Sequence, residues 1–241
     1  MIRFYSPDIE STGQLPADES VHCVRVLRAR DGEEIETVDG KGTVYKCEII
    51  DANPRGVALD ILERHSEAKT WRGRVTLAVA PTKNADRMEW LVEKAVEMGV
   101  DEIVLLRCAR SERKVMKPDR LKRIMVSAMM QSLKATLPIL RGPLDIRDFL
   151  SETAGTSACK VFGYCAQTVE RHDFGQVFNS GSDMTVLIGP EGDFSPEEVT
   201  AAIQSGYKPV TFGLSRLRTE TAALYAVSAF HILNNKEFCN D

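Results

Sequence analysis

The sequence predicts an α/β protein, with a mostly parallel sheet covered by helices on both faces and a small β-rich domain in front of it. Three observations predict this class. After residue 74, short apolar runs of buried-strand length alternate with amphipathic helices, as they do in parallel sheets. Before residue 68, short alternating segments are separated by turn residues. The composition, with 43% hydrophobic and 27% charged residues, is that of a globular protein.

The N-terminal segment has the pattern of a small antiparallel sheet or barrel. Alternation predicts three strands, at residues 34–38, 43–50 and 57–62, with turns between them at 39–42 and 53–56. Residues 21–28 are expected to form a short helix or ordered segment, with Val24 and Leu27 inward and Arg25 and Arg28 outward. The charged stretch 63–74 marks the expected domain boundary, which gives domains at residues 1–68 and 73–237.

The C-terminal segment supplies the strands and helices of the parallel sheet. Apolar runs predict strands at residues 75–80, 103–106, 161–164, 184–188 and 210–212. An apolar stripe from Met88 to Met98 predicts a helix capped by Gly99, and a second helix is expected from about residue 118 towards 134. Residues 219–234 form a largely apolar helix that is buried or packs against a partner subunit. Ligands collect at the carboxyl ends of parallel strands.

A first loop, Gly189-Pro190-Glu191-Gly192, follows the strand at 184–188, and a helix begins soon after it. Ser195 is expected to cap this helix, with Pro196 at its first position and Glu198 completing a capping box. The glycines let main-chain groups approach a ligand such as an adenine edge or a ribose. The alternative is a tight turn that needs glycine for steric reasons alone.

A second loop, Leu214-Ser215-Arg216-Leu217-Arg218-Thr219, joins the strand at 210–212 to the helix at 219–234. Arg216 and Arg218 lie beside a helix N-terminus, where cations oppose the helix dipole. An anionic ligand or RNA would account for these arginines, and an ion pair with Glu191 or Glu220 is the alternative. The two loops together predict one ligand site.

Charge is distributed unevenly along the chain. The formal net charge is -4, yet residues 107–134 contain nine basic and two acidic residues, a local net charge of +7. Such a segment attracts polyanions, and phosphate backbones are the usual partner. The alternative is a solvated helix face.

The sequence excludes several function classes. The Gly-rich cradles of dinucleotide-binding and nucleoside triphosphate-binding proteins are absent from it. The six cysteines and four histidines are dispersed without metal-ligand spacing, so we expect reduced thiols and no metal. No apolar run reaches the roughly 20 residues that cross a bilayer, and the first residues lack the apolar core of a signal peptide, so we expect a cytoplasmic protein.

Six motifs are found together in one known family. They are His22-x-x-Arg25-Val26-Leu27-Arg28, Lys83 with Met88 and Glu93-Lys94-Ala95-x-Glu97-Met98-Gly99, Ser111-Glu112-Arg113, Gln131-Ser132, Ile188-Gly189-Pro190-Glu191-Gly192 and Arg216-Leu217-Arg218-Thr219-Glu220-Thr221-Ala222. The sequence resembles the bacterial 16S ribosomal RNA small-subunit methyltransferase E family, a branch of the SPOUT methyltransferases. The likeness runs from Arg3 to about Asn235.

The resemblance implies a PUA-like β-barrel that binds RNA, followed by a SPOUT-type domain whose C-terminal trefoil knot binds S-adenosylmethionine. It implies a homodimer that methylates N3 of a uridine in the decoding region of 16S rRNA, within the small ribosomal subunit. The match places the cofactor against Leu187, Gly189, Gly192, Leu214 and Leu217, and we extend the cradle to Pro190, Glu191, Arg216 and Thr219. The expected RNA-binding residues are Arg3, Arg25, Arg28, Lys83, Arg113, Arg120 and Arg123.

Two positions depart from the family pattern. Asp193 stands where the family often has a second glycine, and aspartate tolerates a left-handed backbone better than most residues. Leu133-Lys134 stands where a small residue and an arginine are common.

Methylation at N3 requires an exposed base, loss of the N3 proton and alignment of N3 with the methyl donor. We expect Arg218 to stabilise the charge that develops on the uracil oxygens and Glu191 or Glu220 to accept the proton. Two other functions fit the motifs: a SPOUT methyltransferase with another RNA target, and a non-catalytic RNA-binding ribosome-assembly factor.

Overall fold

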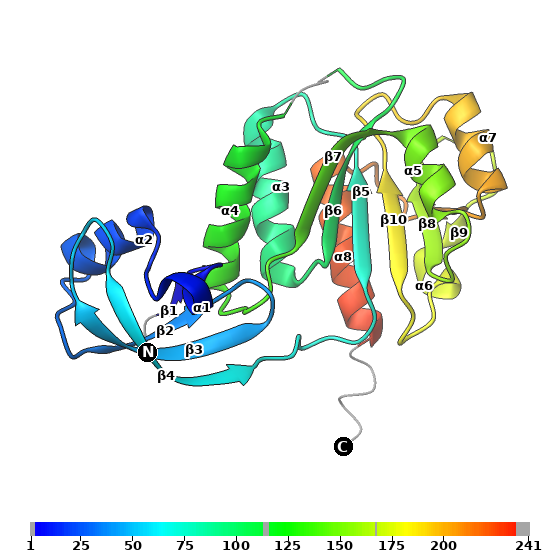
Figure 1. Ribbon diagram of the computed structural model, residues 1–241. Coiled ribbons are helices and arrows are strands. Elements are labelled where there is room, and N and C mark those ends of the chain that lie inside the picture. Colours follow the sequence, from blue (N-terminus) through cyan, green and yellow to red (C-terminus); the bar gives the residue numbers. More distant parts are fainter. Residues whose placement is uncertain (1–2, 113–115, 167, 235–241) are drawn as a thin grey trace. The chain divides into compact units, whose positions relative to one another are not determined.

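The computed structural model describes residues 3–112, 116–166 and 168–234 (Figure 1). The chain forms two compact units. One consists of Met1–Thr70 together with Val126–Leu137, and the other consists of Trp71–Met125 and Pro138–Asp241. The helix α4 (Pro118–Gln131) therefore contributes residues to both units.

The first unit is built on a four-stranded sheet in the order β1-β2-β3-β4. Its strands are β1 (Arg3–Tyr5), β2 (Glu34–Val38), β3 (Thr43–Asp51) and β4 (Ala58–Ser66). The pairs β2–β3 and β3–β4 are antiparallel, as predicted, whereas β1 pairs with β2 in parallel. The prediction of an antiparallel sheet is wrong for β1, because a three-residue strand is too short to show a pattern in the sequence.

The turn between β2 and β3 is fixed by Asp39 and Gly40. The Asp39 Oδ1 atom accepts hydrogen bonds from the backbone N–H groups of Lys41 at 2.7 Å and Thr43 at 3.0 Å. Gly40 has a φ of +76°, and a Cβ added there would lie 2.9 Å from the Tyr5 ring. Glycine is required here both by the backbone conformation and by the close approach of the ring.

Short helices precede β2 in the first unit: α1 (Ile9–Thr12), α2 (Ala17–Val21) and the π-helix η1 (His22–Val26). Cys23 is fully buried and Val24 is half-buried, as an inward residue should be, but Leu27 is exposed. The inward placement predicted for Leu27 is wrong. Its N–H donates to the carbonyl of His22, five residues earlier, and this wider turn changes which residues share a face.

The second unit is built on a seven-stranded sheet in the order β7-β6-β5-β10-β8-β11-β9. All of its strand pairs are parallel, which confirms the predicted sheet type. The strands are β5 (Val75–Val79), β6 (Glu102–Arg107), β7 (Ile139–Asp145), β8 (Cys159–Gly163), β9 (His172–Asp173), β10 (Met184–Ile188) and β11 (Lys208–Thr211).

The sequence prediction omitted β7 and β9. In β7, Gly142 and Pro143 interrupt the apolar pattern, and Gly142 has a φ of +101° with its Cα against the backbone of β6. An added Cβ at Gly142 would lie 2.5 Å from the Leu105 carbonyl oxygen. Proline is tolerated because β7 is an edge strand. The strand β9 has only two residues.

The helices of the second unit include α3 (Ala85–Met98), α5 (Ile146–Thr153), α6 (Phe174–Val177), α7 (Pro196–Gln204) and α8 (Thr219–Asn234). As predicted, α3 ends at Gly99, which adopts a φ of +108°. Its buried stripe includes Met88 and Ala95, but Met98 at the last position is 41% exposed, so the prediction is wrong for that residue. The predicted capping box of Ser195 and Glu198 at the start of α7 is confirmed.

Helices cover both faces of the parallel sheet. On one face, alternate strand residues pack with apolar residues of α5 and α7 in a single cluster that includes Ala78, Val104, Phe162, Leu187, Phe149 and Val199. The intervening residues of β5 and β10 point to the opposite face, where α8 contacts both strands and packs beside α3 (Figure 1). No helix among the described residues is long and apolar enough to cross a membrane.

Candidate functional site

The two loops singled out from the sequence meet at the carboxyl edge of the parallel sheet. β10 lies between β5 and β8, with Ile188 opposite Val79 on one side and Gly163 on the other. Because β6 and β7 lie beyond β5 while β8, β11 and β9 lie beyond β10, the strand order changes direction at the β5–β10 pair. Open parallel sheets bind ligands just outside such a switch point.

The first loop, residues 189–194, is shaped by close packing. Gly189 and Pro190 are buried, and a Cβ added at Gly189 would lie 3.2 Å from the Phe194 ring. Asp193 adopts the left-handed conformation, with a φ of +62°. Its carboxylate accepts hydrogen bonds from the backbone N–H groups of Cys165 at 3.2 Å and Phe194 at 2.9 Å. Aspartate thus adopts the backbone that glycine provides elsewhere, and it holds the loop after β8 as well.

A buried hydrogen bond joins the second loop to the first. The Thr219 hydroxyl, at the start of α8, donates to the Gly189 carbonyl at 3.1 Å. From Gly213 to Arg218 the chain is exposed except at Leu217, which is half-buried, and the Leu214 side chain is fully exposed. The structure therefore brings together Gly189, Pro190, Glu191, Gly192, Leu214, Arg216, Leu217, Arg218 and Thr219 at one edge. Leu187 differs, because its side chain lies in the core between the sheet and α5 and α7.

The two glutamates proposed for proton transfer already have partners. The Glu191 Oε1 atom accepts a hydrogen bond from the backbone N–H of Lys83 at 2.9 Å. The Glu220 Oε1 atom lies 3.8 Å from Arg87 Nε, and the Glu220 side chain is only 9% exposed. Both contacts connect these loops to the segment that follows β5.

The two arginines of the second loop are exposed. Within the part of the chain that the structure describes, no ion pair joins Arg216 or Arg218 to Glu191 or Glu220. The ion pair considered as the alternative in the sequence analysis is therefore not formed, and both glutamates contact other residues. Arg216 lies near Cys165. Burial raises the pKa of the Cys165 thiol, Asp193 adds to this rise, and Arg216 opposes it. The positive charges at the start of α8 are thus exposed to an incoming anion.

Two further residues of the site were not singled out as site residues from the sequence. The Arg110 Nη1 atom, from the loop after β6, donates to the Gly192 carbonyl at 2.9 Å and the Phe194 carbonyl at 3.4 Å. The buried Glu198 carboxylate accepts hydrogen bonds from the backbone N–H groups of Ala109 at 2.7 Å and Ser195 at 2.8 Å. The available signal for Arg110 was a basic residue three positions beyond the end of the buried strand β6.

The basic residues of the second unit differ in how they are engaged. The Lys83 ammonium is 2.8 Å from Glu112, and this hydrogen bond and ion pair raise the pKa of Lys83. Arg120 contacts Glu89 of α3 through two atoms, at 2.6 and 2.7 Å. Arg123 is exposed and donates only to the Asp119 carbonyl, at 3.4 Å, among the described residues. Arg113 lies outside the described residues.

The basic residues proposed on the first unit are of two kinds. The Arg3 side chain is 11% exposed and pairs with Glu36 at 3.2 Å and Glu67 at 3.1 Å. Burial by itself lowers the pKa of Arg3, but the hydrogen bonds and charges of these glutamates outweigh it and raise that pKa. Arg3 therefore contributes internal contacts within this unit. Arg25 and Arg28 are exposed, and Arg28 adopts a φ of +59°.

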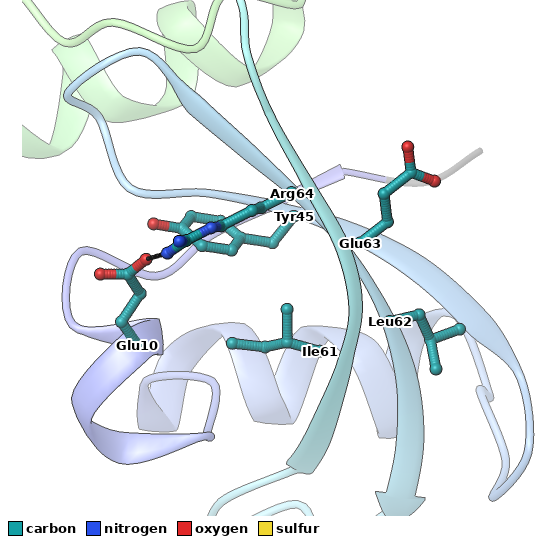
Figure 2. Close-up of a pocket in the computed structure, with 6 residues that line it drawn as sticks. All are labelled: Glu10, Tyr45, Ile61, Leu62, Glu63 and Arg64. Carbon is teal, nitrogen blue, oxygen red and sulfur yellow. Dashed lines mark hydrogen bonds and ion pairs between the residues drawn. The ribbon is translucent and has the colours of Figure 1, made fainter.

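A hollow of about 530 Å³ lies on the first unit, against β3 and β4 (Figure 2). Its lining consists of Glu10, Tyr45, Ile61, Leu62, Glu63 and Arg64. Figure 2 shows Arg64 and Glu10 pointing towards one another, and their ion pair is 2.8 Å long. The hollow is largely open to solvent, and these two charged groups are already paired with each other.

The cysteines give no sign of metal or disulfide chemistry in the described chain. Cys23, Cys47, Cys108, Cys159 and Cys165 are free thiols, and the first three are buried, as expected of core residues. Cys239 lies outside the described residues. Across residues 3–112, 116–166 and 168–234, no group of three or more His, Cys, Asp or Glu is arranged to hold a metal ion.

Comparison with known proteins connects this geometry to a family. A model of the RNA methyltransferase domain matches residues 69–231, and a model of the RNA methyltransferase PUA domain matches residues 15–62. The ribosomal RNA small subunit methyltransferase E of Mycobacterium bovis is 31% identical over 240 residues, which cover 95% of this chain and 90% of that protein. The chain belongs to the ribosomal RNA small subunit methyltransferase E family.

Solved structures agree with this family membership. A Porphyromonas gingivalis protein described as a probable rRNA-methyltransferase has a TM-score of 0.92 and 43% identity, with 97% of this chain and 98% of that chain covered. The ribosomal RNA small subunit methyltransferase E of Neisseria gonorrhoeae, solved with S-adenosyl methionine bound, has a TM-score of 0.83 and 28% identity over the same shares of the two chains. The resemblance inferred from the sequence motifs is confirmed.

Proposed function

We propose that this protein transfers a methyl group from S-adenosylmethionine to N3 of a uridine in 16S rRNA, in the decoding region of the small ribosomal subunit. The observation that carries the proposal is the meeting of the two loops at the sheet's carboxyl edge, joined by the Thr219–Gly189 hydrogen bond, in a member of this family. We further propose the domain division at residues 1–68 and 73–237, a trefoil knot in the C-terminal part and a homodimer as the working form.

The cradle residues fit S-adenosylmethionine. When bound, this cofactor supplies an electrophilic methyl group on a sulfonium. Gly189 and Gly192 carry no side chain that would separate the main chain from a ligand. Close packing also requires glycine at both positions, because an added Cβ would meet the Phe194 ring or Arg110 at 3.2 Å. The fully exposed Leu214 side chain, an unusual feature for a large apolar residue, gains burial when a ligand covers it. Leu187 would contribute through its backbone alone, since its side chain lies in the core.

The chain's own residues account for the chemistry on the base. Arg218 is exposed and has no side-chain partner within the described residues, so its guanidinium is available to stabilise negative charge on a uracil oxygen. Glu191 or Glu220 accepts the N3 proton, directly or through a water molecule. Positioning of the base is the larger contribution, because alignment alone supplies about 7 to 11 kcal/mol in favourable cases.

The RNA contacts divide between the two units. On the first unit, Arg25 and Arg28 are exposed and suit phosphate contacts. On the second unit, Arg123 and Lys83 present exposed charge, and Lys83 exchanges Glu112 for a phosphate when RNA binds. The internal ion pairs of Arg3 make it the weakest of the proposed RNA contacts.

The test is mass spectrometry of rRNA from a strain in which the gene is deleted, with and without the gene restored. We expect one methylated uridine of the small-subunit rRNA to disappear and to return on complementation. Loss of a modification elsewhere would identify another RNA target. An unchanged modification profile, together with no binding of S-adenosylmethionine by calorimetry, would leave a non-catalytic RNA-binding role.

A further inference from the structure

The loop after β6 is fastened to the proposed cofactor loop by one exposed side chain. Arg110 Nη1 donates to the carbonyls of Gly192 and Phe194, at 2.9 and 3.4 Å. The contact is close on both sides, because a Cβ added at Gly192 would lie 3.2 Å from Arg110 Cβ and 3.7 Å from the Arg110 carbonyl oxygen. The position of the Gly192 carbonyl therefore depends on Arg110.

The same loop lies within the basic segment, residues 107–134, and Arg110 is one of the basic residues of that segment. It is itself well ordered by internal contacts, since the Ser111 N–H donates to the Cys108 carbonyl and the Cys108 N–H donates to the Ser111 hydroxyl, both at 3.1 Å. Ser111 is buried. Arg110 therefore belongs to this turn and also, through its guanidinium, contacts the Gly192 carbonyl.

We propose that Arg110 is a positioning residue that couples S-adenosylmethionine binding at residues 189–192 to RNA binding at the basic segment. The inference rests on the proposed function of both sites. A cofactor that fixes the position of the Gly192 carbonyl also fixes Arg110, which is itself a basic residue of this segment. RNA that contacts Arg110 favours the same carbonyl position, because coupling between two sites is reciprocal.

A second connection keeps the fold intact when Arg110 is changed. The buried Glu198 carboxylate holds the Ala109 and Ser195 N–H groups, so the two loops stay joined without Arg110. Arg110 itself is exposed, and its removal leaves no buried donor unpaired. We therefore expect Arg110→Ala to fold and to unfold in urea at a midpoint close to that of the wild type.

The test is a binding cycle with two unreactive probes, S-adenosylhomocysteine and a transcript of the small-subunit rRNA. The dissociation constant of S-adenosylhomocysteine is measured by equilibrium dialysis without RNA and with saturating RNA. For the wild type we expect binding about 5-fold or more tighter with RNA, the usual lower range of coupling between sites. For Arg110→Ala the ratio falls to about 1, and Arg110→Lys restores part of it because an ammonium reaches the same carbonyls.

Arg123→Ala is the matched control, since it removes one positive charge from the same segment without touching the cofactor loop. It is expected to weaken RNA binding but to keep the wild-type ratio when RNA is saturating. Gly192→Ala is a second disruption, which keeps Arg110 but places a new Cβ about 3.2 Å from Arg110 Cβ. It should also lower the ratio.

The inference is overturned if the wild-type ratio is 1, or if Arg110→Ala keeps the wild-type ratio. Either result leaves the proposed function standing as long as the wild type binds both probes and methylates rRNA. A wild type that binds no S-adenosylhomocysteine overturns the proposed function first, and the coupling with it.

Discussion

Replacing Glu198 by alanine should destabilise the second unit substantially. Glu198 is 5% exposed, and its two carboxylate oxygens accept N–H groups from Ala109 and Ser195 at 2.7 and 2.8 Å. Removal of the carboxylate leaves the buried Ser195 N–H without an acceptor and breaks the capping box of α7. Each unpaired buried donor costs about 1 to 3 kcal/mol, and water can reach the less buried Ala109 N–H, so we expect a loss of about 2 to 4 kcal/mol.

Urea unfolding followed by tryptophan fluorescence measures this loss in the second unit, because both tryptophans of the chain, Trp71 and Trp90, belong to it. Glu198→Gln keeps one carbonyl acceptor and should lose about half as much stability. Glu197→Ala is the matched control, since this exposed neighbour accepts only the Ser195 hydroxyl among the described residues. Equal midpoints for Glu198→Ala and Glu197→Ala would refute the assignment of Glu198 as the connection between the loops.

Three other changes test the site, the basic helix and the core. Arg218→Ala should keep the dissociation constant for S-adenosylmethionine within a few fold and lose most methyl transfer, and an unchanged turnover would remove Arg218 from the mechanism. Arg123→Glu should weaken rRNA binding most at low salt and leave the urea midpoint unchanged. Arg120→Glu should weaken binding and also lower the urea midpoint, because Arg120 pairs with Glu89. Equal urea midpoints for the two variants would contradict this. Burial raises the pKa of Tyr207 to about 12, although its hydrogen bond with Thr153 by itself lowers that pKa. The stability contributed by the neutral phenol is therefore complete below its unfolded pKa of about 10 and is lost as the pH rises towards 12. A spectrophotometric titration should show one phenol that ionises at a higher pH than the others, and this ionisation should be missing in Tyr207→Phe.

The elements that the sequence predicted well are those whose signal is local. The start of α7 is determined by Ser195, Pro196 and Glu198 within four residues, and the end of α3 by a single glycine, Gly99. The buried strands β5 and β10 are uninterrupted apolar runs. In each case the residues that set the structure are close together in the chain, so the pattern can be read without the tertiary fold.

The partners of charged residues could not be predicted in this way. Arg3 pairs with Glu67, which is 64 residues away, and Arg120 pairs with Glu89 of another helix. In sequence both arginines look like free cations suited to RNA. Only the folded chain shows that their charges are already matched. It also shows that Arg216 and Arg218 are exposed near the proposed ligand.

Asp193 shows how a departure from the family pattern is accommodated. Its φ of +62° lies in a region that glycine adopts without cost and that costs other residues about 1 to 2 kcal/mol. Its carboxylate offsets this cost with hydrogen bonds to Cys165 and Phe194. The loop keeps the backbone path that a glycine would give and gains a connection to the segment after β8.

The contacts of the two candidate proton acceptors separate their roles. Glu220 is nearly buried at the first turn of α8, where its carboxylate lies against Arg87. Glu191 is exposed; its Oε1 atom accepts the Lys83 N–H, and its charge also acts on the Lys83 ammonium. A general base must present a lone pair to the substrate or to a bridging water, and the exposed Glu191 carboxylate is more accessible for this than the nearly buried Glu220 carboxylate. Glu191 is therefore the better proposed acceptor for the N3 proton, and Glu220 contributes by holding Arg87 against the start of α8.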